Sequence, residues 1–287
     1  MTVRIFIVFC ALIFTAIDLP AGIWDNVTNY LKGTSREKPP TIRVLVLHDV
    51  DGIDLEVQGK YFVVDPNTNI QQGNRRYVGK KRYMEALSGG LKWGEEFPGI
   101  HQIQIIPLES SGIISLDGKE YEGSMNVYEI EKGKGRISFV NEVPVEDYLL
   151  SILNGYQDQN LEPETMAALA IAARTTAYYQ AINPKSKFWA VDAQKVGFGG
   201  KVFTSTPIKD AVRQTRNMIM SKTGVYEGSA TPFPALFGHL QGDELPKNAV
   251  VSKITLEEAN AMAKNGSHAA QILAKAFPGS TIMLIQK

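Results

Sequence analysis

Residues 145–179, "VEDYLLSILNGYQDQNLEPETMAALAIAARTTAYY", have the pattern of two helices joined by a short polar turn. In its first part the apolar residues fall at positions i, i+3, i+4, i+7, i+8 and i+11. They are Val145, Tyr148, Leu149, Ile152, Leu153 and Tyr156. This period predicts one face of a helix with Tyr156 at its C-terminal end. The polar turn "NGYQDQ" (154–159) follows. Pro163 and Glu164 then begin a second helix, because proline fits the first turn and glutamate complements the helix dipole there.

The second helix carries a charge in an apolar setting. Its run "MAALAIAA" (166–173) is small and apolar on nearly every side, which predicts close packing in the interior, and Arg174 follows directly. An uncompensated buried guanidinium costs several kcal/mol, so Arg174 needs a carboxylate partner. Glu146 or Asp147 on the first helix is positioned to supply it. Two roles stay open: an ion pair that joins the helices, or a cleft arginine that also contacts a ligand.

Residues before Pro144 alternate between apolar and polar instead of repeating every 3.6 positions. The strands predicted on this ground are 41–48, 54–58, 60–65, 100–108 and 112–118. "MNVYEIEKGKGRISFVNEV" (125–143) predicts a β-hairpin with "KGKG" at its turn. The first half of the chain is therefore rich in strands.

Beyond the two helices the pattern is mixed. "FWAVDAQKVGFGGKVF" (188–203) predicts a strand with a glycine-rich bend. Helices are predicted at 206–224, 255–264 and 267–276, and a last strand at 281–285. Together these elements predict an α+β fold: a mixed, β-rich first half, a buried helical hairpin and C-terminal helices, in a single domain of residues 42–287.

The sequence offers no recognisable cofactor or metal motif. Gly197, Gly199 and Gly200 lack the spacing of a phosphate or dinucleotide loop and indicate a β-bulge or tight turn. The four histidines are His48, His101, His239 and His268, and no pair of them has the spacing of metal ligands. Cys10 is the single cysteine, which excludes a disulfide framework. We therefore expect neither a cofactor nor a metal.

The charge balance argues against nucleic acid as a partner. Thirty basic residues offset thirty acidic ones, so no net field favours nucleic acid or an anionic membrane surface. Hydrophobic residues make up 44% and charged residues 21%, the composition of a folded soluble protein.

The N-terminus has the features of an export signal. Arg4 precedes an apolar run, residues 5–17, that would rise about 20 Å as a helix, too short to cross a bilayer core of about 30 Å comfortably. We predict a signal peptide or N-terminal anchor (1–22), with cleavage near Ala21, and a linker (23–41). The remainder would lie in the periplasm or cell envelope, and membrane contact would come only through the N-terminal segment.

The central stretch resembles the SpoIID/LytB family. "VEDYL" (145–149), "PETMAALAIAART" (163–175) and "AYY" (177–179) match the family pattern without a gap. Five further segments occur in family order: "IRVLVL" (42–47), "YEG" (121–123), "AQKVGFGG" (193–200), "AVRQTRNMIMSKTG" (211–224) and "AMAKNGSHAAQILAKAFPGSTI" (261–282). The resemblance extends over residues 42–284.

This resemblance implies lytic cleavage of peptidoglycan glycan strands. In that reaction one glutamic acid protonates the glycosidic oxygen, and the muramyl 6-hydroxyl attacks to leave a 1,6-anhydro end. The family's glutamate corresponds to Tyr156 here, and a phenol with a pKa of about 10 is a poor acid for a glycoside at neutral pH. Two other family motifs are altered as well, at 238–243 and 249–260. The resemblance therefore implies a degenerate cleft.

One acidic residue offers a substitute for the missing acid. Asp158 lies two positions after Tyr156, and burial in a rearranged turn would raise its pKa toward that of a general acid. The catalytic residue is otherwise unknown from the sequence.

The function predicted from these observations is an exported protein that binds peptidoglycan glycan strands, in cell-wall remodelling or division, without cleaving them. The residues predicted to line the substrate cleft are Tyr148, Tyr156, Arg174, Gln194 and Phe198, although the aromatic residues could equally pack in the core. Two alternatives stay open: an active lytic transglycosylase acting on denuded strands, and a scaffold that binds other cell-wall or division proteins and no sugar.

Overall fold

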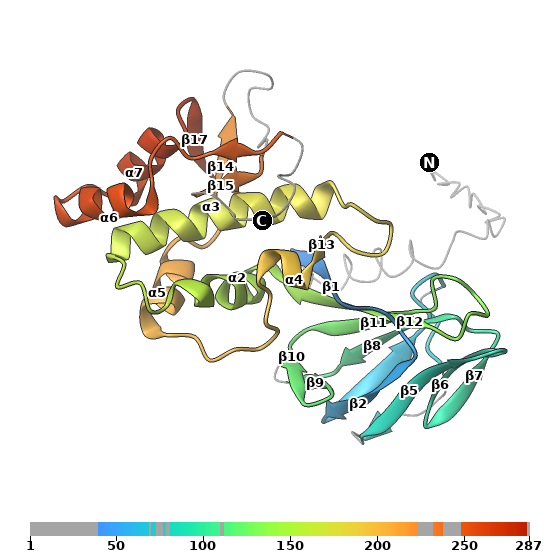
Figure 1. The fold of residues 1–287 in the computed structure, drawn as a ribbon. Helices are drawn as coiled ribbons and strands as arrows, with labels where there is room; N and C mark the ends of the chain where they lie inside the picture. The colour runs from blue at the N-terminus through green and yellow to red at the C-terminus, as the bar shows by residue number, and fades with distance from the viewer. Residues whose placement is uncertain are drawn as a thin grey trace, which may run out of the picture. The chain divides into compact units, whose positions relative to one another are not determined.

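The computed structural model describes residues 40–68, 70–72, 77–78, 81–109, 112–222, 232–237 and 248–285. All of them belong to one compact unit, Pro39–Lys287. It contains both sheets and helices, which confirms the predicted α+β class (Figure 1). The predicted signal or anchor (1–22) and the motif position 238–243 lie outside the described residues. No helix in the described part is long and apolar enough to span a membrane.

The larger sheet has seven strands, in the order β13-β1-β12-β11-β8-β3-β4. Their bounds are β1 (Thr41–Val50), β3 (Lys60–Val64), β4 (Tyr77–Val78), β8 (Gln102–Pro107), β11 (Ser124–Tyr128), β12 (Ile137–Pro144) and β13 (Val191–Asp192). Side chains alternate between the two faces of a strand. Met125 and Val127 of β11 therefore face the core, and Ser124, Asn126 and Tyr128 lie on the opposite, more polar face.

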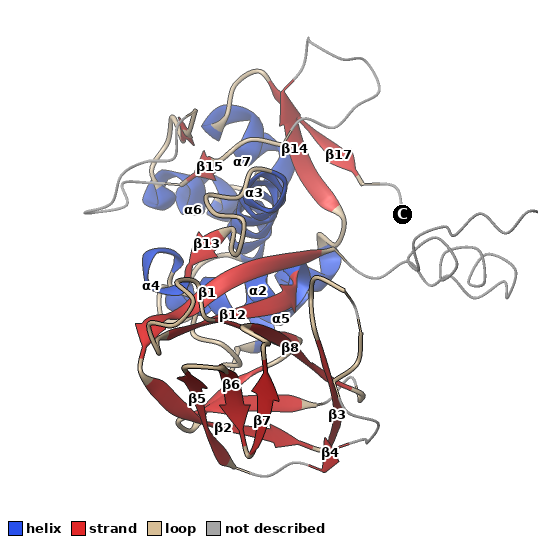
Figure 2. Cartoon of the chain, turned by 90° about the vertical axis from the view of Figure 1, so that its right-hand side faces the viewer, coloured by secondary structure: helices blue, strands red, loops and turns tan. Residues whose placement is uncertain are grey.

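A second sheet of six strands packs against the apolar face of the first, in the order β10-β9-β2-β5-β6-β7 (Figure 2). Its strands are β2 (Gly52–Gln58), β5 (Arg82–Leu87), β6 (Gly90–Trp93), β7 (Glu95–Pro98), β9 (Ile113–Leu116) and β10 (Lys119–Tyr121). Val57, Met84 and Trp93 join Ile105 and Val127 of the larger sheet in one core. This apolar layer holds the two sheets together.

Strands β5, β6 and β7 occupy a stretch for which the sequence predicted no element. The buried hydrophobic residues there are Met84, Leu91, Trp93 and Phe97, and charged residues stand between them. Each strand is only four to six residues long, so its alternation covers too few positions to stand out.

The helices gather around α3 (Pro163–Ile182), which begins at Pro163 as predicted. Figure 1 shows α6 and α7 on one side of α3 and α2 and α5 on the other. The bounds are α2 (Val145–Leu153), α5 (Thr206–Gln214), α6 (Leu256–Lys264) and α7 (Ala269–Ala276). After α2 the chain continues as a single 3₁₀ turn, η1 (Asn154–Tyr156). The alanines of α3 permit this crowding, since Ala168 and Ala172 pack directly against neighbouring elements in a second core.

Two predictions of secondary structure were wrong. Residues 188–203 contain only the short strand β13 and then the helix α4 (Ala193–Val196), because the Asp192 carboxylate caps the Gln194 N–H at 2.9 Å. Residues 206–222 change from helix to strand at Asn217, which has φ 66°. The strand that follows, β14 (Met218–Lys222), pairs with β17 (Ser280–Leu284), a partner too distant in sequence for local periodicity to reveal. Near it, β15 (Ala235–Leu236) and β16 (Val250–Val251) form a small parallel pair.

The glycine-rich bend is a tight turn, one of the two forms predicted for it, and it fastens α4 to the smaller sheet. Gly197 (φ 69°) ends α4, and Gly200 has φ 77°. A Cβ atom on Gly200 would lie 2.4 Å from the Glu120 carbonyl oxygen, whereas a Cβ on Gly197 would meet nothing within 4 Å. The Lys201 N–H donates to the same Glu120 carbonyl at 2.8 Å. Gly200 is therefore required because the Glu120 carbonyl lies where a Cβ atom would be. Gly197 is favoured only by its positive φ.

We predict that Gly200→Ala lowers the free energy of unfolding by about 2–4 kcal/mol, because it adds a clash to the left-handed strain. Gly197→Ala, the matched control, carries the strain alone and should cost about 1–2 kcal/mol. Urea denaturation of both variants measures the difference. Equal losses would show that the contact with Glu120 does not constrain the bend.

Candidate functional site

A cavity of about 360 Å³ lies between the helical hairpin and the segment 235–237. Its walls include Leu153 and Tyr156 from the end of the first helix and Ala173 and Gln180 from α3. Lys185 and Lys195 also line it, and both are exposed. The cavity is thus mostly apolar with a few polar groups, as ligand sites commonly are.

Tyr156, one of the residues predicted to line the substrate cleft, lies on the wall of this cavity. Its side chain is half-buried, and burial raises the pKa of the phenol above its usual value of about 10. The hydroxyl is therefore neutral at physiological pH and even less acidic than a free tyrosine. It can offer a hydrogen bond and a ring face but is a poor proton donor to a leaving group.

Tyr148 and Phe198 stack on each other, with ring centroids 5.7 Å apart and an angle of 26° between the planes. Both are buried, and burial raises the pKa of the Tyr148 phenol. Tyr148 lines the cavity beside Tyr156, whereas Phe198 lines a smaller cavity next to it. Their mutual contact matches the packing role considered for them.

Gln194 and Asp158 lie away from the cavity wall. Gln194 is exposed in the first turn of α4, and its neighbour Lys195 lines the cavity in its place. Asp158 is exposed in the turn after η1, so the burial that a general acid would require is missing. None of the described residues that line the cavity is an aspartate or a glutamate.

An unpartnered acceptor belongs to this cavity. Oε1 of Gln180 is buried and receives no hydrogen bond from the described residues. Gln180 lines the cavity, so a hydroxyl or amide N–H of a ligand could satisfy this oxygen. The sequence indicated nothing special about Gln180, because its role depends on the residues opposite α3.

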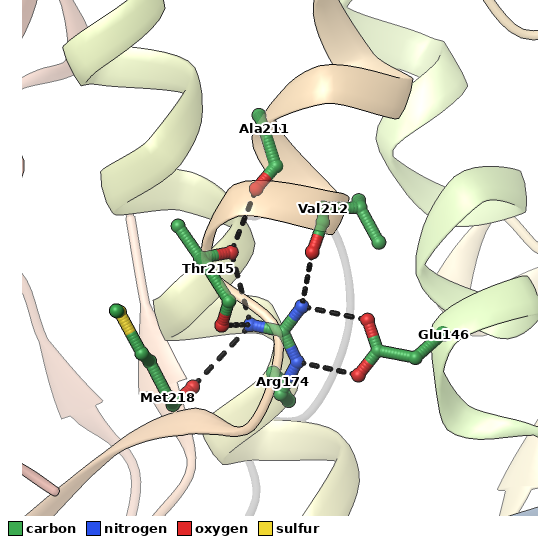
Figure 3. Close-up of polar contacts among 6 residues, drawn as sticks. All are labelled: Glu146, Arg174, Ala211, Val212, Thr215 and Met218. Carbon is green, nitrogen blue, oxygen red and sulfur yellow. Dashed lines mark hydrogen bonds and ion pairs between the residues drawn. The ribbon is translucent and has the colours of Figure 1, made fainter. Parts of the chain in front are cut away.

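Arg174 is completely buried and joins the elements around the cavity (Figure 3). Its Nε and Nη2 atoms each donate to the Glu146 carboxylate at 2.8 Å. Nη2 also donates to the Val212 carbonyl at 3.1 Å, and Nη1 donates to the carbonyls of Thr215 (2.9 Å) and Met218 (3.3 Å). Every guanidinium nitrogen thus has an acceptor within the protein. The contacts fit the role of an ion pair between helices, and contact with a ligand would require one of these bonds to break.

Asp147, the other candidate partner of Arg174, faces a different cavity of about 200 Å³. Glu122, Lys201, Lys209 and Phe198 line this cavity with it. Burial, followed by the negative charge of Glu122, raises the pKa of Asp147 to about 6. No feature of the sequence distinguished Asp147 from its neighbour Glu146 in this respect.

The described residues contain no group of three or more His, Cys, Asp or Glu side chains that could hold a metal ion.

Comparison with known proteins agrees with the resemblance seen in the sequence. Residues 133–221 match the SpoIID family model, described as stage II sporulation protein. This range includes the helical hairpin, Tyr156 and Arg174, so the chain carries a SpoIID domain there. The resemblance proposed for residues 42–132 and 222–284 extends beyond the matched range and stays a prediction.

Three bacterial proteins are similar to the chain. An uncharacterized protein of Chlamydia muridarum is 30% identical over 184 residues, 63% of this chain and 63% of the relative. One of Chlamydia pneumoniae is 29% identical over 185 residues, 63% of this chain and 66% of the relative. One of Brachyspira hyodysenteriae is 31% identical over 154 residues, which is 52% of this chain and 39% of the relative. The chain covers less than two thirds of each relative's own length.

We predict that Arg174→Met destabilises the protein by about 3–5 kcal/mol, because it leaves the Glu146 carboxylate without its bidentate partner and the Val212 carbonyl without this donor. Arg213→Met is the matched control. It breaks a 2.7 Å pair with Asp210 in which the Arg213 side chain is 75% exposed, and it should cost less than about 1 kcal/mol. Urea denaturation measures both, and similar losses for the two variants would contradict the central role of Arg174.

Asp147 should make stability depend on pH. Its folded-state pKa of about 6 exceeds the ordinary value of 3.8, so between these values the folded state holds a proton that the unfolded state has released. The stability that this proton contributes is complete below about pH 4 and is lost as the pH rises through 6. Solvent screens the charge of a half-buried carboxylate, so we expect the free energy of unfolding to fall by only about 1–2 kcal/mol as the pH rises through 6.

Asp147→Asn should remove this part of the pH dependence and leave a protein that is more stable than the wild type at pH 7. Urea denaturation of both proteins between pH 4 and 8 tests it. Parallel curves for the two proteins would show that Asp147 does not titrate differently in the folded state.

Proposed function

We propose that this chain, whose residues 133–221 contain a SpoIID domain, binds peptidoglycan glycan strands in the cavity of the helical hairpin without cleaving them. The family match supports a role related to the cell wall. The proposal goes beyond the family match in three respects: glycan binding, the loss of catalysis, and a place in cell-wall remodelling or division.

The observation that carries the proposal is the absence of a carboxyl group from the described cavity wall. Cleavage of a glycosidic bond needs an acid that protonates the leaving oxygen from within hydrogen-bond reach. Tyr156 occupies the position where the resemblance places that acid, and burial makes its phenol a weaker acid still. The cavity retains a surface for a sugar but no described group able to supply the proton.

The remaining groups suit a saccharide. The half-buried Tyr156 presents an aromatic ring to the cavity, and such a ring combines a large apolar contact with a polar tip. Gln180 supplies the unpartnered acceptor for a sugar hydroxyl or acetamido N–H. Both charged residues on the described wall, Lys185 and Lys195, are cationic. A glycan strand stripped of its peptides carries a free lactyl carboxylate on each muramyl residue, so we infer that stripped strands are the preferred ligand.

The proposed ligand requires export. We therefore propose that the protein acts in the periplasm or cell envelope, and that residues 1–22 serve as its signal or anchor. Other cell-wall or division proteins are candidate partners in the same compartment.

Binding is tested by co-sedimentation of the full-length chain with peptide-stripped glycan strands. Tyr156→Ala should weaken the association about 5–10-fold, because it removes the ring contact, worth about 1 kcal/mol or somewhat more. Tyr83→Ala is the matched control: Tyr83 lies in β5 and is 50% exposed, and its loss should leave sedimentation unchanged. A wild-type chain that does not sediment would refute glycan binding and favour the scaffold alternative.

Catalysis is tested separately, by incubating the full-length chain with stripped and intact strands and searching for 1,6-anhydromuramyl ends by mass spectrometry. We expect none from the wild type. If such ends appear and Asp158→Asn abolishes them, the protein is an active enzyme with Asp158 as its acid, and the proposal of a silent cleft is wrong.

A further inference from the structure

A second large cavity lies on the sheet and not at the helical hairpin. It measures about 580 Å³ and is formed over the polar face of the seven-stranded sheet, opposite the core. Strands β1, β8, β11 and β12 contribute its floor, and the segment around Phe188 forms part of its wall. Sites for small ligands usually have volumes of about 300–1,000 Å³.

The floor is a row of amide side chains arranged by strand register. Asn126 on β11 pairs with Gln104 on β8, and Tyr128 pairs with Gln102 in the same way. The side-chain amide of Gln104 donates to Ser124 (3.1 Å) and to Glu142 (3.2 Å). These bonds hold Gln104 in place, so the floor is preorganised.

Asn126 is the exception in this row. It is only 2% exposed, yet its Nδ2 atom is buried and has no hydrogen-bond acceptor among the described residues. An unsatisfied buried donor destabilises the folded state, and Asn126 lines the cavity. A ligand that brings an acceptor oxygen to this point would recover that free energy.

The wall adds an aromatic surface. The rings of Tyr128 and Phe188 are 4.7 Å apart at an angle of 52°, and Phe188 is only half-buried. Arg43 donates to the Lys187 carbonyl at 2.8 Å and so fastens this segment over the sheet. A sugar ring could rest on such a surface while its hydroxyls reach the amides below.

Another part of the lining contains a buried carboxylate. Glu129 accepts from the N–H groups of Gly133 (2.8 Å) and Gly135 (3.1 Å) and lies 2.5 Å from Nδ1 of His101. These contacts order the loop that bounds the cavity. They also occupy Glu129, so this carboxylate is a structural element of the lining.

The charges on the wall cancel. Arg43, Lys132 and Lys187 are balanced by Asp65, Glu129 and Glu142. A wall whose cations and anions balance does not attract ligands of one sign of charge over the other. Amides that donate and accept, a half-buried aromatic ring and a wall without net charge together suit an uncharged polyhydroxy ligand.

We propose that this cavity binds an uncharged sugar of about disaccharide size, with an oxygen of the sugar accepting from Asn126. The site is separate from the cavity of the helical hairpin, because the two share no lining residue. Asn126, Gln102 and Gln104 precede the range 133–221 that matches the family model, whereas Glu142, Lys187 and Phe188 lie within it.

Saturation-transfer difference NMR on the full-length chain tests the proposal, with chitobiose, cellobiose and maltose as probes and the zwitterion alanyl-alanine as the peptide probe. At least one disaccharide should bind, and Asn126→Ala should weaken it at least 5-fold. Phe188→Ala, at the half-buried wall, should do the same and serves as a second variant if Asn126→Ala does not fold. Tyr83→Ala is the matched control and should bind as the wild type does.

The other outcomes overturn the proposal. If no disaccharide binds, or if only alanyl-alanine does, the cavity is not a sugar site. If Tyr156→Ala abolishes disaccharide binding and both cavity variants retain it, the sugar occupies the helical hairpin. Co-sedimentation of Asn126→Ala with glycan strands separates the two proposals. If the strands bind at the helical hairpin, the Asn126→Ala variant should sediment as the wild type does, whether or not it binds a disaccharide.

Discussion

A single buried guanidinium organises the helical part of this protein. Arg174 is enclosed completely, and a charge in that position is tolerated only if each of its donors finds an acceptor. The Glu146 carboxylate and the carbonyls of Val212, Thr215 and Met218 supply them. These acceptors belong to α2, the end of α5 and the start of β14. The Arg174 side chain therefore bonds three elements to α3. The Val212 carbonyl near the end of α5 gains a donor in the same step, whereas the Thr215 carbonyl also accepts from the Met218 N–H at 2.9 Å.

The cavity of the helical hairpin depends on that arrangement. Its walls come from α2, η1 and α3, and the first of these is held to the third by the Arg174–Glu146 pair. The consequence for function is an apolar cleft with an aromatic ring and an unpartnered amide oxygen but no carboxyl group on its described wall. Binding and proton transfer require different groups, so the two capacities can be tested separately. Tyr156 lies on the wall of this cavity, at the position where the resemblance places the acid.

The two large cavities differ because helices and strands place polar groups differently. On α3 nearly every side is occupied by small apolar residues, so its cavity is apolar with isolated polar atoms. On the larger sheet, alternation sends Met125 and Val127 into the core and leaves Asn126 and Tyr128 on the outer face. A row of amides then forms without any irregularity of the backbone. Among the predicted site residues, Tyr148 and Tyr156 line the first cavity, whereas Gln194 and Asp158 do not, because neither the orientation of α4 nor the exposure of the turn follows from spacing.

The α+β class, the helical hairpin and the need for a carboxylate beside Arg174 could be predicted from the chain, because they follow from local periodicity and from the cost of burying a charge. The choice of Glu146 over Asp147 as the partner, the pairing of β14 with β17 and the unpartnered donor of Asn126 became visible only in the folded unit. Each of these depends on residues far apart in the chain, whose pairing is selected by packing of the whole unit and leaves no trace in a local pattern.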